Sequence, residues 1–270
     1  MNEILCVDVS HHQGRVDWAA VKRAGIEHCI LRAGYGLSGA DRRFQENAQG
    51  AAAAGLHMGA YWFSYASSVP DAQKEADRFL LTLADFRAQI DMPVFFDSEY
   101  EAQQKAKAAG IKDFPALYNA MAQAFCQQVQ AAGFRPGIYF NEDYYRYVAD
   151  LTRLAGLPLW LARYKPDNPF ACDLWQYTDK GRVDGIDTPV DMNRLLNPAL
   201  VQPRPFAPYE ASAAQDVPLN VRQEPGAGCK LGALRPGQRF TVIEEKNGWG
   251  RIEFAPGIFG WVDLSGAQRA

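Results

Sequence analysis

The run from Pro93 to Tyr100 places two carboxylates directly after a short apolar segment. Asp97 and Glu99 are separated by one residue, and side chains at positions i and i+2 of an extended chain lie on the same face. A pair of carboxylates on one face suits glycoside cleavage, in which one acid donates a proton and the other stabilises or attacks the sugar. So short a motif also occurs as two solvated acids in a loop, and its meaning therefore depends on its surroundings.

Two further acids follow apolar runs elsewhere in the chain. Asp8 comes after the run that begins at Ile4, and Asp191 lies in the run Val190-Asp-Met-Asn193. We expect both at carboxyl ends of strands, the edge at which β/α barrels carry their active sites. Aromatic side chains that could stack on sugar rings follow similar runs, and they are Tyr35, Tyr61, Trp62, Tyr139, Tyr164 and Trp175. For each aromatic taken alone, packing in the core is the more common role.

The elements that must position these residues alternate along the first 197 positions. Strand-sized apolar runs cover 4–9, 29–33, 58–63, 93–96, 137–140, 159–164 and 174–177, and helical patterns cover 17–24, 41–54, 70–88 and 115–132. Unbroken apolar strands that alternate with helices indicate an α/β fold with a mainly parallel sheet buried on both faces. The number of units favours a closed (β/α) barrel, which we expect to be irregular and to have fewer helices after Tyr139.

The rest of the chain changes character twice. Four prolines punctuate residues 198–214, which predicts a semi-rigid linker. From 215 to 270, strand-sized runs at 219–222, 239–243, 250–254 and 260–262 are separated by Pro-Gly and Asn-Gly dipeptides. This spacing predicts a small all-β barrel. The predicted domains are thus 1–197, the linker 198–214, and 215–270.

Composition excludes some functions. A formal net charge of −3 gives no reason to expect nucleic acid as a partner. No apolar run approaches the ~20 residues that cross a bilayer, and the first residues lack the basic head and apolar core of a signal peptide. Five widely spaced cysteines indicate free thiols and no disulfide framework. His11 and His12 are adjacent and point apart on an extended segment, so we expect neither a metal nor a cofactor.

Taken in order, these residues resemble the family-25 glycoside hydrolases, which are lysozyme-type N-acetylmuramidases of bacteria and phages. The resemblance covers nearly all of the first 197 residues. It is carried by Asp8-Val-Ser-His-His-Gln-Gly14, Val16-Asp-Trp18, Ile30-Leu-Arg-Ala-Gly-Tyr-Gly36, Asp41 with Phe44 and Asn47, Ala54-Gly-Leu56, Gly59-Ala-Tyr-Trp-Phe63, Asp97-Ser-Glu99, Gly137-Ile-Tyr139, Leu159-Trp-Leu-Ala-Arg-Tyr164, Trp175-Gln-Tyr177 and Val190-Asp-Met-Asn193. One departure is Trp62, where the family commonly has His.

The resemblance implies hydrolysis of the β-1,4 bond between N-acetylmuramic acid and N-acetylglucosamine in bacterial peptidoglycan. It implies that Glu99 is the general acid and then the base, and that Asp97 orients or stabilises the substrate's 2-acetamido group. Asp8 and Asp191 would line the same site, and Gln176 would join the aromatic residues in contacting substrate. Close carboxylates should raise the pKa of the acid, because one ionised group disfavours a second. Whether the acetamido group or an enzyme carboxylate attacks the sugar stays open.

The tail resembles the bacterial SH3 domains of cell-wall hydrolases. The matching runs are Leu219-Asn-Val-Arg222, Pro225-Gly226, Leu234-Arg-Pro-Gly237, Asn247-Gly-Trp249 and Gly260-Trp-Val262. The resemblance implies that this domain binds the cell wall. Residues 215–270 hold seven Lys or Arg against six Asp or Glu, so recognition would depend on shape and on Trp249, Phe259 and Trp261.

Two alternatives remain at this point: a glycosidase of other N-acetylated glycans such as chitin, and a non-catalytic wall-binding protein. We expect a monomer that is made in the cytoplasm and acts on the wall without inserting into a membrane. A phage endolysin released through a holin-type pore would fit, as would secretion by a route that uses no signal peptide.

Overall fold

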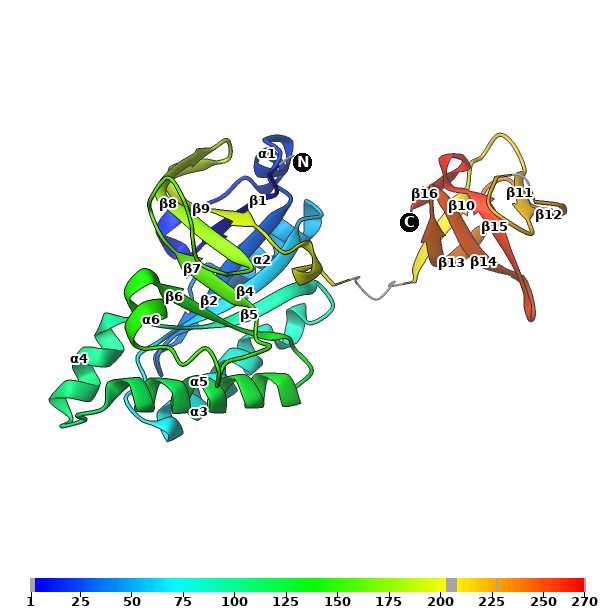
Figure 1. Cartoon of the computed structure of the whole chain (residues 1–270). Helices are drawn as coiled ribbons and strands as arrows, with labels where there is room; N and C mark the ends of the chain where they lie inside the picture. Colours follow the sequence, from blue (N-terminus) through cyan, green and yellow to red (C-terminus); the bar gives the residue numbers. More distant parts are fainter. Residues whose placement is uncertain (1–2, 203–207, 227, 270) are drawn as a thin grey trace. The chain divides into compact units, whose positions relative to one another are not determined.

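The computed structural model describes residues 3–202, 208–226 and 228–269. The chain divides into two compact units, Met1–Arg204 and Pro205–Ala270 (Figure 1). Each unit has its own hydrophobic core and is described by itself. No helix among the described residues is long and apolar enough to cross a membrane.

In the described part of the first unit, eight strands close into a barrel. They are β1 (Leu5–Val9), β2 (His28–Tyr35), β4 (His57–Ser64), β5 (Ile90–Ser98), β6 (Pro136–Asn141), β7 (Leu159–Ala162), β8 (Leu174–Val183) and β9 (Ile186–Leu195). Their order is β1-β9-β8-β7-β6-β5-β4-β2, and pairing of β1 with β2 closes the ring. The two-residue strand β3 (Gly39–Ala40) pairs with β2 outside this ring. The predicted irregular barrel is confirmed, and its irregularity is β9, which runs antiparallel to both β1 and β8.

Helices cover the strands in the first two thirds of this unit. They are α1 (Trp18–Arg23), α2 (Phe44–Ala53), α3 (Val69–Leu83), α4 (Tyr100–Ala108), α5 (Phe114–Ala131) and α6 (Glu142–Tyr147). Side-chain caps start several of them: Ser68 accepts a hydrogen bond from the amide of Asp71, and Asp113 accepts one from Ala116. The long helices α3 and α5 pack against each other on one side of the barrel (Figure 1). Between β7 and β9 the described chain forms no α-helix, as predicted for the late segments.

Alternation along the strands separates two apolar layers. Phe95 packs inside the barrel with Trp160, whereas its neighbour Phe96 packs outward against Phe125 of α5. Burial of each such side chain contributes about 1.5–3 kcal/mol. The barrel interior is therefore a filled core, and the polar side chains that follow these strands are left at its carboxyl end.

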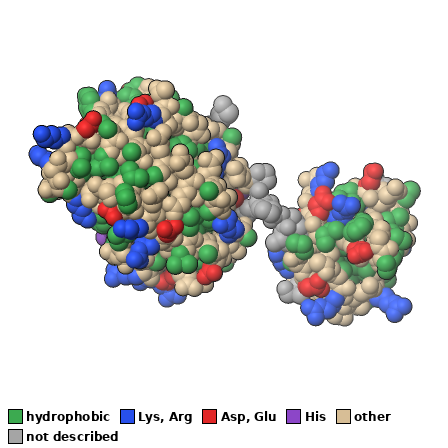
Figure 2. Space-filling model, turned by 90° about the horizontal axis from the view of Figure 1, so that it is seen from below, with side chains coloured by type: hydrophobic (Ala, Val, Ile, Leu, Met, Phe, Trp, Pro, Cys, Tyr) green, Lys and Arg blue, Asp and Glu red, His purple; other side chains and the backbone are tan. Residues whose placement is uncertain are grey.

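The second unit is an antiparallel sheet with a small core. Its strands are β10 (Tyr209–Ala213), β11 (Leu219–Arg222), β12 (Lys230–Leu234), β13 (Arg239–Lys246), β14 (Trp249–Ala255), β15 (Ile258–Asp263) and β16 (Ala267–Arg269), in the order β12-β11-β15-β14-β13-β10-β16. Val221, Val242, Ile252 and Val262 form the centre of its core. Acidic and basic side chains are interspersed over the described residues of both units on the face that Figure 2 shows.

The predicted linker over 198–214 needs correction at both ends. Pro198–Leu200 is a short 3-10 turn, and Leu200 is buried in the interior cluster of the barrel. Tyr209–Ala213 is a strand that pairs with β13 and β16. The alternation in this strand buries only alanines, Ala211 and Ala213, which is why a strand was not evident. Residues 203–207, where two of the four prolines lie, are outside the described residues.

Candidate active site

A cavity of about 350 Å³ lies at the carboxyl ends of the parallel barrel strands. Its lining residues are Asp8, Ser10, His12, Gln13, Arg32, Tyr61, Phe63, Asp97, Glu99, Tyr139, Trp160, Tyr164, Gln176, Asp179, Pro189 and Asp191. The cavity thus brings together all four acids singled out from the sequence. Residues far apart in the chain meet here because the barrel places every strand end on one rim.

Strand β5 presents the central pair of acids. Asp97 lies between Phe63 of β4 and Tyr139 of β6 in the strand register, and its side chain is 4% exposed. Glu99 follows the end of β5 and is the residue from which α4 begins. Asp97 and Glu99 both line the cavity, as the i and i+2 spacing predicts.

Burial sets the protonation of this pair. It raises the pKa of Asp97 well above the ordinary value, and the charges of Glu99 and Asp8 act in the same direction. Oδ1 of Asp97 is buried and has no hydrogen-bond partner among the described residues. Burial also raises the pKa of Glu99, against a hydrogen bond of 3.4 Å that Asn141 Nδ2 donates to Glu99 Oε2. Groups in this state are suited to proton transfer.

Asp8 is held by two amides. Oδ2 of Asp8 accepts hydrogen bonds from Gln176 Nε2 at 2.9 Å and from Asn193 Nδ2 at 2.8 Å. The indole of Trp160 donates to Asn193 Oδ1 at 2.7 Å, which fixes the orientation of that amide. Burial, followed by the charge of Asp191, raises the pKa of Asp8 well above its ordinary value.

The second amide joins Asp8 to aromatic hydroxyls. Oε1 of Gln176 accepts hydrogen bonds from the hydroxyls of Tyr164 at 2.8 Å and of Tyr139 at 3.4 Å. Tyr139 is buried, whereas Tyr164 is 51% exposed. The network therefore extends from a buried carboxyl to a tyrosine that is open to solvent at the cavity rim.

Asp191 lines the cavity from a different position in its strand than the predicted one. It lies in the middle of β9 and not at a carboxyl end, because β9 runs antiparallel to its neighbours. The register places Asp191 directly opposite Asp8 on β1. Burial raises the pKa of Asp191 to about 6, and the nearby Asp179 adds to this shift. Asp191 lines the cavity with the other three acids, but its expected place at a carboxyl end of a strand was wrong.

Three of the aromatic candidates do not line the cavity. Trp62 is fully buried in the layer between strands and helices, where its ring lies 5.7 Å from that of Phe79. Trp175 is covered by the guanidinium of Arg194 at 5.0 Å, and its indole donates to the backbone oxygen of Arg163. Tyr35 is half-buried at the end of β2 and is also absent from the cavity lining. Strand alternation turns Trp62 and Trp175 away from the barrel interior.

Tyr61, Tyr139, Tyr164 and Gln176 do line the cavity, and they are joined by residues that the sequence did not single out. Phe63 lines it because it shares a face with Tyr61, a signal that was present in the alternation. Arg32 lines it as well, and Asp41 accepts a hydrogen bond of 2.8 Å from its Nε. Asp41 also contacts Nδ1 of His11 at 2.8 Å, so these residues support a cation beside the acids.

A second hollow of about 300 Å³ adjoins the cavity. It is lined by Glu99, Tyr100, Tyr139, Asn141, Glu142, Asp143, Ala162, Arg163 and Tyr164. Glu99, Tyr139 and Tyr164 belong to both hollows. An extended ligand could therefore occupy both with the bond between its two parts close to Glu99.

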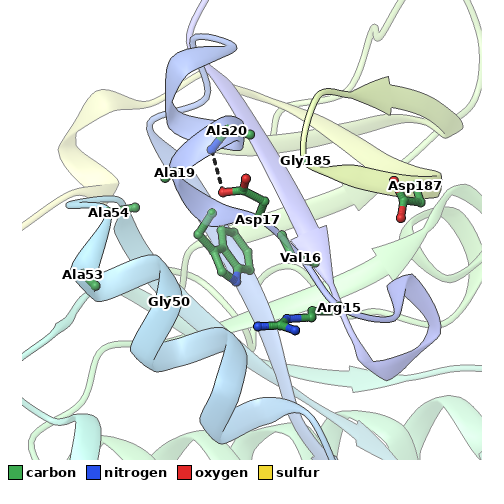
Figure 3. A pocket seen from close by; sticks show the side chains of 11 residues that line it. Arg15, Val16, Asp17, Ala19, Ala20, Gly50, Ala53, Ala54, Gly185 and Asp187 are labelled. Atoms are coloured by element: carbon green, nitrogen blue, oxygen red, sulfur yellow. Dashed lines mark hydrogen bonds between the residues drawn. The ribbon is translucent and has the colours of Figure 1, made fainter.

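Another pocket, of about 770 Å³, has a different lining. Figure 3 shows it between α1, α2 and the turn that carries Gly185. Alanines and Gly50 form much of its wall, and Asp17 uses its carboxylate to accept a hydrogen bond from the amide of Ala20. None of the four candidate acids lines this pocket, and of its two carboxylates, Asp17 and Asp187, the first is engaged in capping α1.

The chain is similar to known proteins in sequence and in fold. Over 200 residues the chain is 33% identical to a protein of Escherichia coli strain K12 that is described as uncharacterized protein YegX, covering 69% of this chain and 67% of that one. It is 27% identical over 198 residues to an autolytic lysozyme of Clostridium acetobutylicum, covering 72% of this chain and 56% of that one. The fold is similar to that of the modular autolysin LytC from Streptococcus pneumoniae, solved with a synthetic peptidoglycan ligand, with a TM-score of 0.63 at 20% identity.

That likeness covers 72% of this chain and 46% of the autolysin, so the chain spans less than half of the autolysin's length. The model of a bacterial SH3 domain matches residues 218–267. The model of the glycosyl hydrolases family 25 matches residues 7–186, which is more than half of the chain and contains Asp8, Asp97 and Glu99. The chain therefore belongs to the glycosyl hydrolases family 25, with a bacterial SH3 domain after its barrel.

Proposed function

We propose that the protein is a lysozyme, which hydrolyses the β-1,4 bond between N-acetylmuramic acid and N-acetylglucosamine in bacterial peptidoglycan. The observation that carries this proposal is the convergence of Asp97 and Glu99, from the end of one strand, on a cavity that Asp8 and Asp191 also line. Membership of the glycosyl hydrolases family 25 supports it, as do relatives named as lysozymes. The adjoining hollow beside Glu99 gives room for a sugar on each side of the scissile bond.

In this proposal Glu99 is the general acid and then the base. Burial raises its pKa, so a larger fraction of Glu99 carries a proton near neutral pH than of an exposed carboxyl. Glu99 donates this proton to the oxygen of the leaving sugar. The resulting carboxylate then accepts a proton from the water that completes hydrolysis.

Asp97 takes the role of orienting the 2-acetamido group. Asp97 lines the cavity beside Glu99, so its carboxyl can accept a hydrogen bond from the N–H of the substrate amide. An N–H held in this way directs the amide carbonyl oxygen towards the anomeric carbon. The acetamido group would then attack in place of an enzyme carboxylate, which is a known exception to the two-carboxylate scheme.

Mass spectrometry of digested peptidoglycan tests the reaction directly. We expect new reducing ends that carry N-acetylmuramic acid, and we expect Glu99→Gln to slow their release by at least ~100-fold. Asp97→Asn should slow it as well while leaving the fold unchanged. Glucosamine at the new ends, or cleavage of chitin oligomers with no action on walls, would contradict the proposal, as would full activity of Glu99→Gln.

We also propose that the SH3 domain holds the enzyme on the wall. On β15, the buried Val262 alternates with Phe259 and Trp261, so the two aromatic side chains lie on the outer face of the sheet. Phe259 is 43% exposed, and the guanidinium of Arg251 lies 5.1 Å from the centre of its ring. An aromatic face beside a cation suits stacking and hydrogen bonding to wall glycan or peptide.

The setting in which the protein acts is a further part of the proposal. Action on the wall as a monomer, for example as an endolysin, accords with a barrel and a wall-binding domain in a single chain. Light scattering of the purified full chain would contradict the monomer if it gave twice the mass of 30.0 kDa.

A further inference from the structure

We propose that Asn141 is a positioning residue, which orients the Glu99 carboxyl and selects the oxygen that carries its proton. This inference rests on the proposed role of Glu99 as general acid. Asn141 lines the hollow beside Glu99 and lies at the junction of β6 and α6. It was not among the residues singled out from the sequence.

Both polar atoms of the Asn141 side-chain amide form hydrogen bonds. Oδ1 accepts a hydrogen bond from the backbone amide of Tyr144 at 2.9 Å, which caps the first turn of α6. Nδ2 donates to Glu99 Oε2 at 3.4 Å. Because the cap requires an acceptor, it fixes which end of the amide is the oxygen, and the donor must then face Glu99. Helix capping therefore determines the direction of the hydrogen bond in the site.

A second link holds the two helix starts together. The hydroxyl of Tyr100, the first residue of α4, donates to Asp143 Oδ2 at 2.7 Å. The rings of Tyr100 and Tyr144 meet edge to face with centres 5.6 Å apart. Glu99 precedes Tyr100 in the chain, so these contacts join α6 to the residue that directly follows the acid. Asn141 is thus held in a defined place relative to Glu99.

The choice of residue at this cap is informative. Asn, Asp and Ser are about equally good N-caps, and elsewhere the chain caps α1 with Asp17 and α3 with Ser68. Asn197, which caps a 3-10 turn, likewise donates its Nδ2 to a carboxylate, Asp173 Oδ1, at 2.6 Å. Asn carries its capping acceptor and its donor on two different atoms, whereas Ser68 accepts and donates with one hydroxyl close to the backbone. A residue that only capped α6 would not need a second hydrogen-bond donor. The property that favours Asn at position 141 is therefore its N–H donor to Glu99.

This contact has two chemical consequences. While Glu99 is protonated, Oε2 accepts from Asn141, and the proton is left on Oε1. After the proton has been given away, the same N–H stabilises the carboxylate and opposes the rise in pKa that burial causes. Asn141 would therefore assist both halves of the reaction, the donation and the return of the proton. A distance of 3.4 Å without substrate leaves room for the bond to shorten when the site is occupied.

Three substitutions in the full chain separate capping from positioning. Asn141→Ser keeps a cap but removes the amide donor, and Asn141→Asp keeps the cap and places a like charge beside Glu99. Asn141→Ala removes both the cap and the donor. The thermal midpoint reports the cap, and the pH profile of kcat/KM on peptidoglycan fragments reports the donor.

We expect Asn141→Ser to unfold at nearly the wild-type temperature, to lose about tenfold in kcat and to shift the alkaline limb of the profile to higher pH. Asn141→Asp should shift that limb further in the same direction, because both changes favour the protonated form of Glu99. Asn141→Ala should show the shift together with a lower thermal midpoint. Titration of the Glu99 carboxyl by 13C NMR in each variant should show the same order of pKa, independently of activity.

A wild-type kcat and an unshifted profile in Asn141→Ser would overturn the inference and leave Asn141 as a cap alone. This result is distinguishable from failure of the proposed function. If Glu99→Gln is inactive while Asn141→Ser behaves as wild type, the role of Glu99 as general acid is supported and the positioning role of Asn141 is rejected. If Glu99→Gln is fully active, the proposed function itself is wrong.

Discussion

Asp8, Asp97, Glu99 and Asp191 share one cavity, and each is kept there against the preference of a carboxylate for water. Asp8 is compensated by two amide donors, whereas Asp97 Oδ1 has no partner among the described residues. The raised pKa values of these groups are thus a cost to the folded state near neutral pH. The barrel is therefore less stable than it could be, and the unfavourable electrostatic energy is located in the four acids that line the cavity.

Asp191 allows this cost to be measured. Its pKa in the folded protein is about 6, above the value of 3.8 for an unperturbed Asp, so its unfavourable contribution develops as the pH rises from 3.8 to about 6 and is complete above that. Asp191→Asn should therefore raise the thermal midpoint of the barrel by a few degrees at pH 7, and the gain should vanish below about pH 4. Asp85→Asn, at an exposed carboxyl on a 3-10 turn, is the matched control and should change little. A lower midpoint for Asp191→Asn at pH 7 would show that Asp191 stabilises the fold instead.

At the scale of elements, the turn between β8 and β9 governs how Asp179 and Asp191 enter the cavity. The backbone oxygen of Gly185 accepts a hydrogen bond of 2.9 Å from the amide of Asp17, which joins the turn to the segment before α1 (Figure 3). Gly185 has φ +97, and a Cβ there would lie 2.4 Å from the backbone oxygen of Asp17. Both the conformation and the close approach therefore require glycine.

Gly185→Ala should destabilise the barrel by about 2–4 kcal/mol, since the left-handed conformation and the backbone clash add. Activity should fall as well, because the strands that leave this turn carry Asp179 and Asp191. Gly156→Ala is the control, because Gly156 has φ +83 and open space around a Cβ, and it should cost only about 1 kcal/mol. Chemical denaturation of both variants gives the comparison. Equal losses would mean that the contact with Asp17 does not restrain the turn.

The sequence predicted the strands and helices better than it predicted the direction in which a strand runs or the side to which its aromatic residues point. Parallel strands, helices and the acids at the ends of β1 and β5 could be read from apolar runs, because buried strands need them. The reversed direction of β9 could not, since a strand has the same alternation in either direction. Trp62 and Trp175 were predicted to contact substrate, but they point out of the barrel. Side chains alternate between the two faces of a strand, so a shift of one position decides whether an aromatic lies inside or outside. The hydrogen bond from Asn141 to Glu99 depends on distances between two loops, which no local pattern encodes.

At the scale of the whole molecule, the proposed cleavage and the proposed attachment belong to separate units with separate cores. Substitutions on the outer face of β15 in the SH3 domain, which carries Phe259 and Trp261, should therefore affect retention on walls without changing the chemistry of the cavity. This separation also means that a measured loss of lysis has two possible origins, which a soluble substrate distinguishes from insoluble walls.

Trp261→Ala should lower retention of the full chain on purified walls by about tenfold, because it removes the half-buried aromatic at the centre of the outer face. Hydrolysis of soluble glycan fragments should stay at the wild-type rate. Val217→Ala alters an apolar residue that is 60% exposed outside β15 and serves as the control, with retention unchanged. Equal retention of both variants would place wall recognition elsewhere.

The closure of the barrel has a consequence for the timing of folding. Strand β1 pairs with β2 and with β9, and the two amides that hold Asp8 lie 168 and 185 positions further along the chain. Contacts of such sequence separation form late, because the intervening chain must be ordered before they are gained. A nascent chain that has not yet released β8 and β9 from the ribosome can build the helices and the first strands, but Asp8 then lacks both of its donors. The cavity of the four acids is therefore assembled only after the whole barrel has been synthesised.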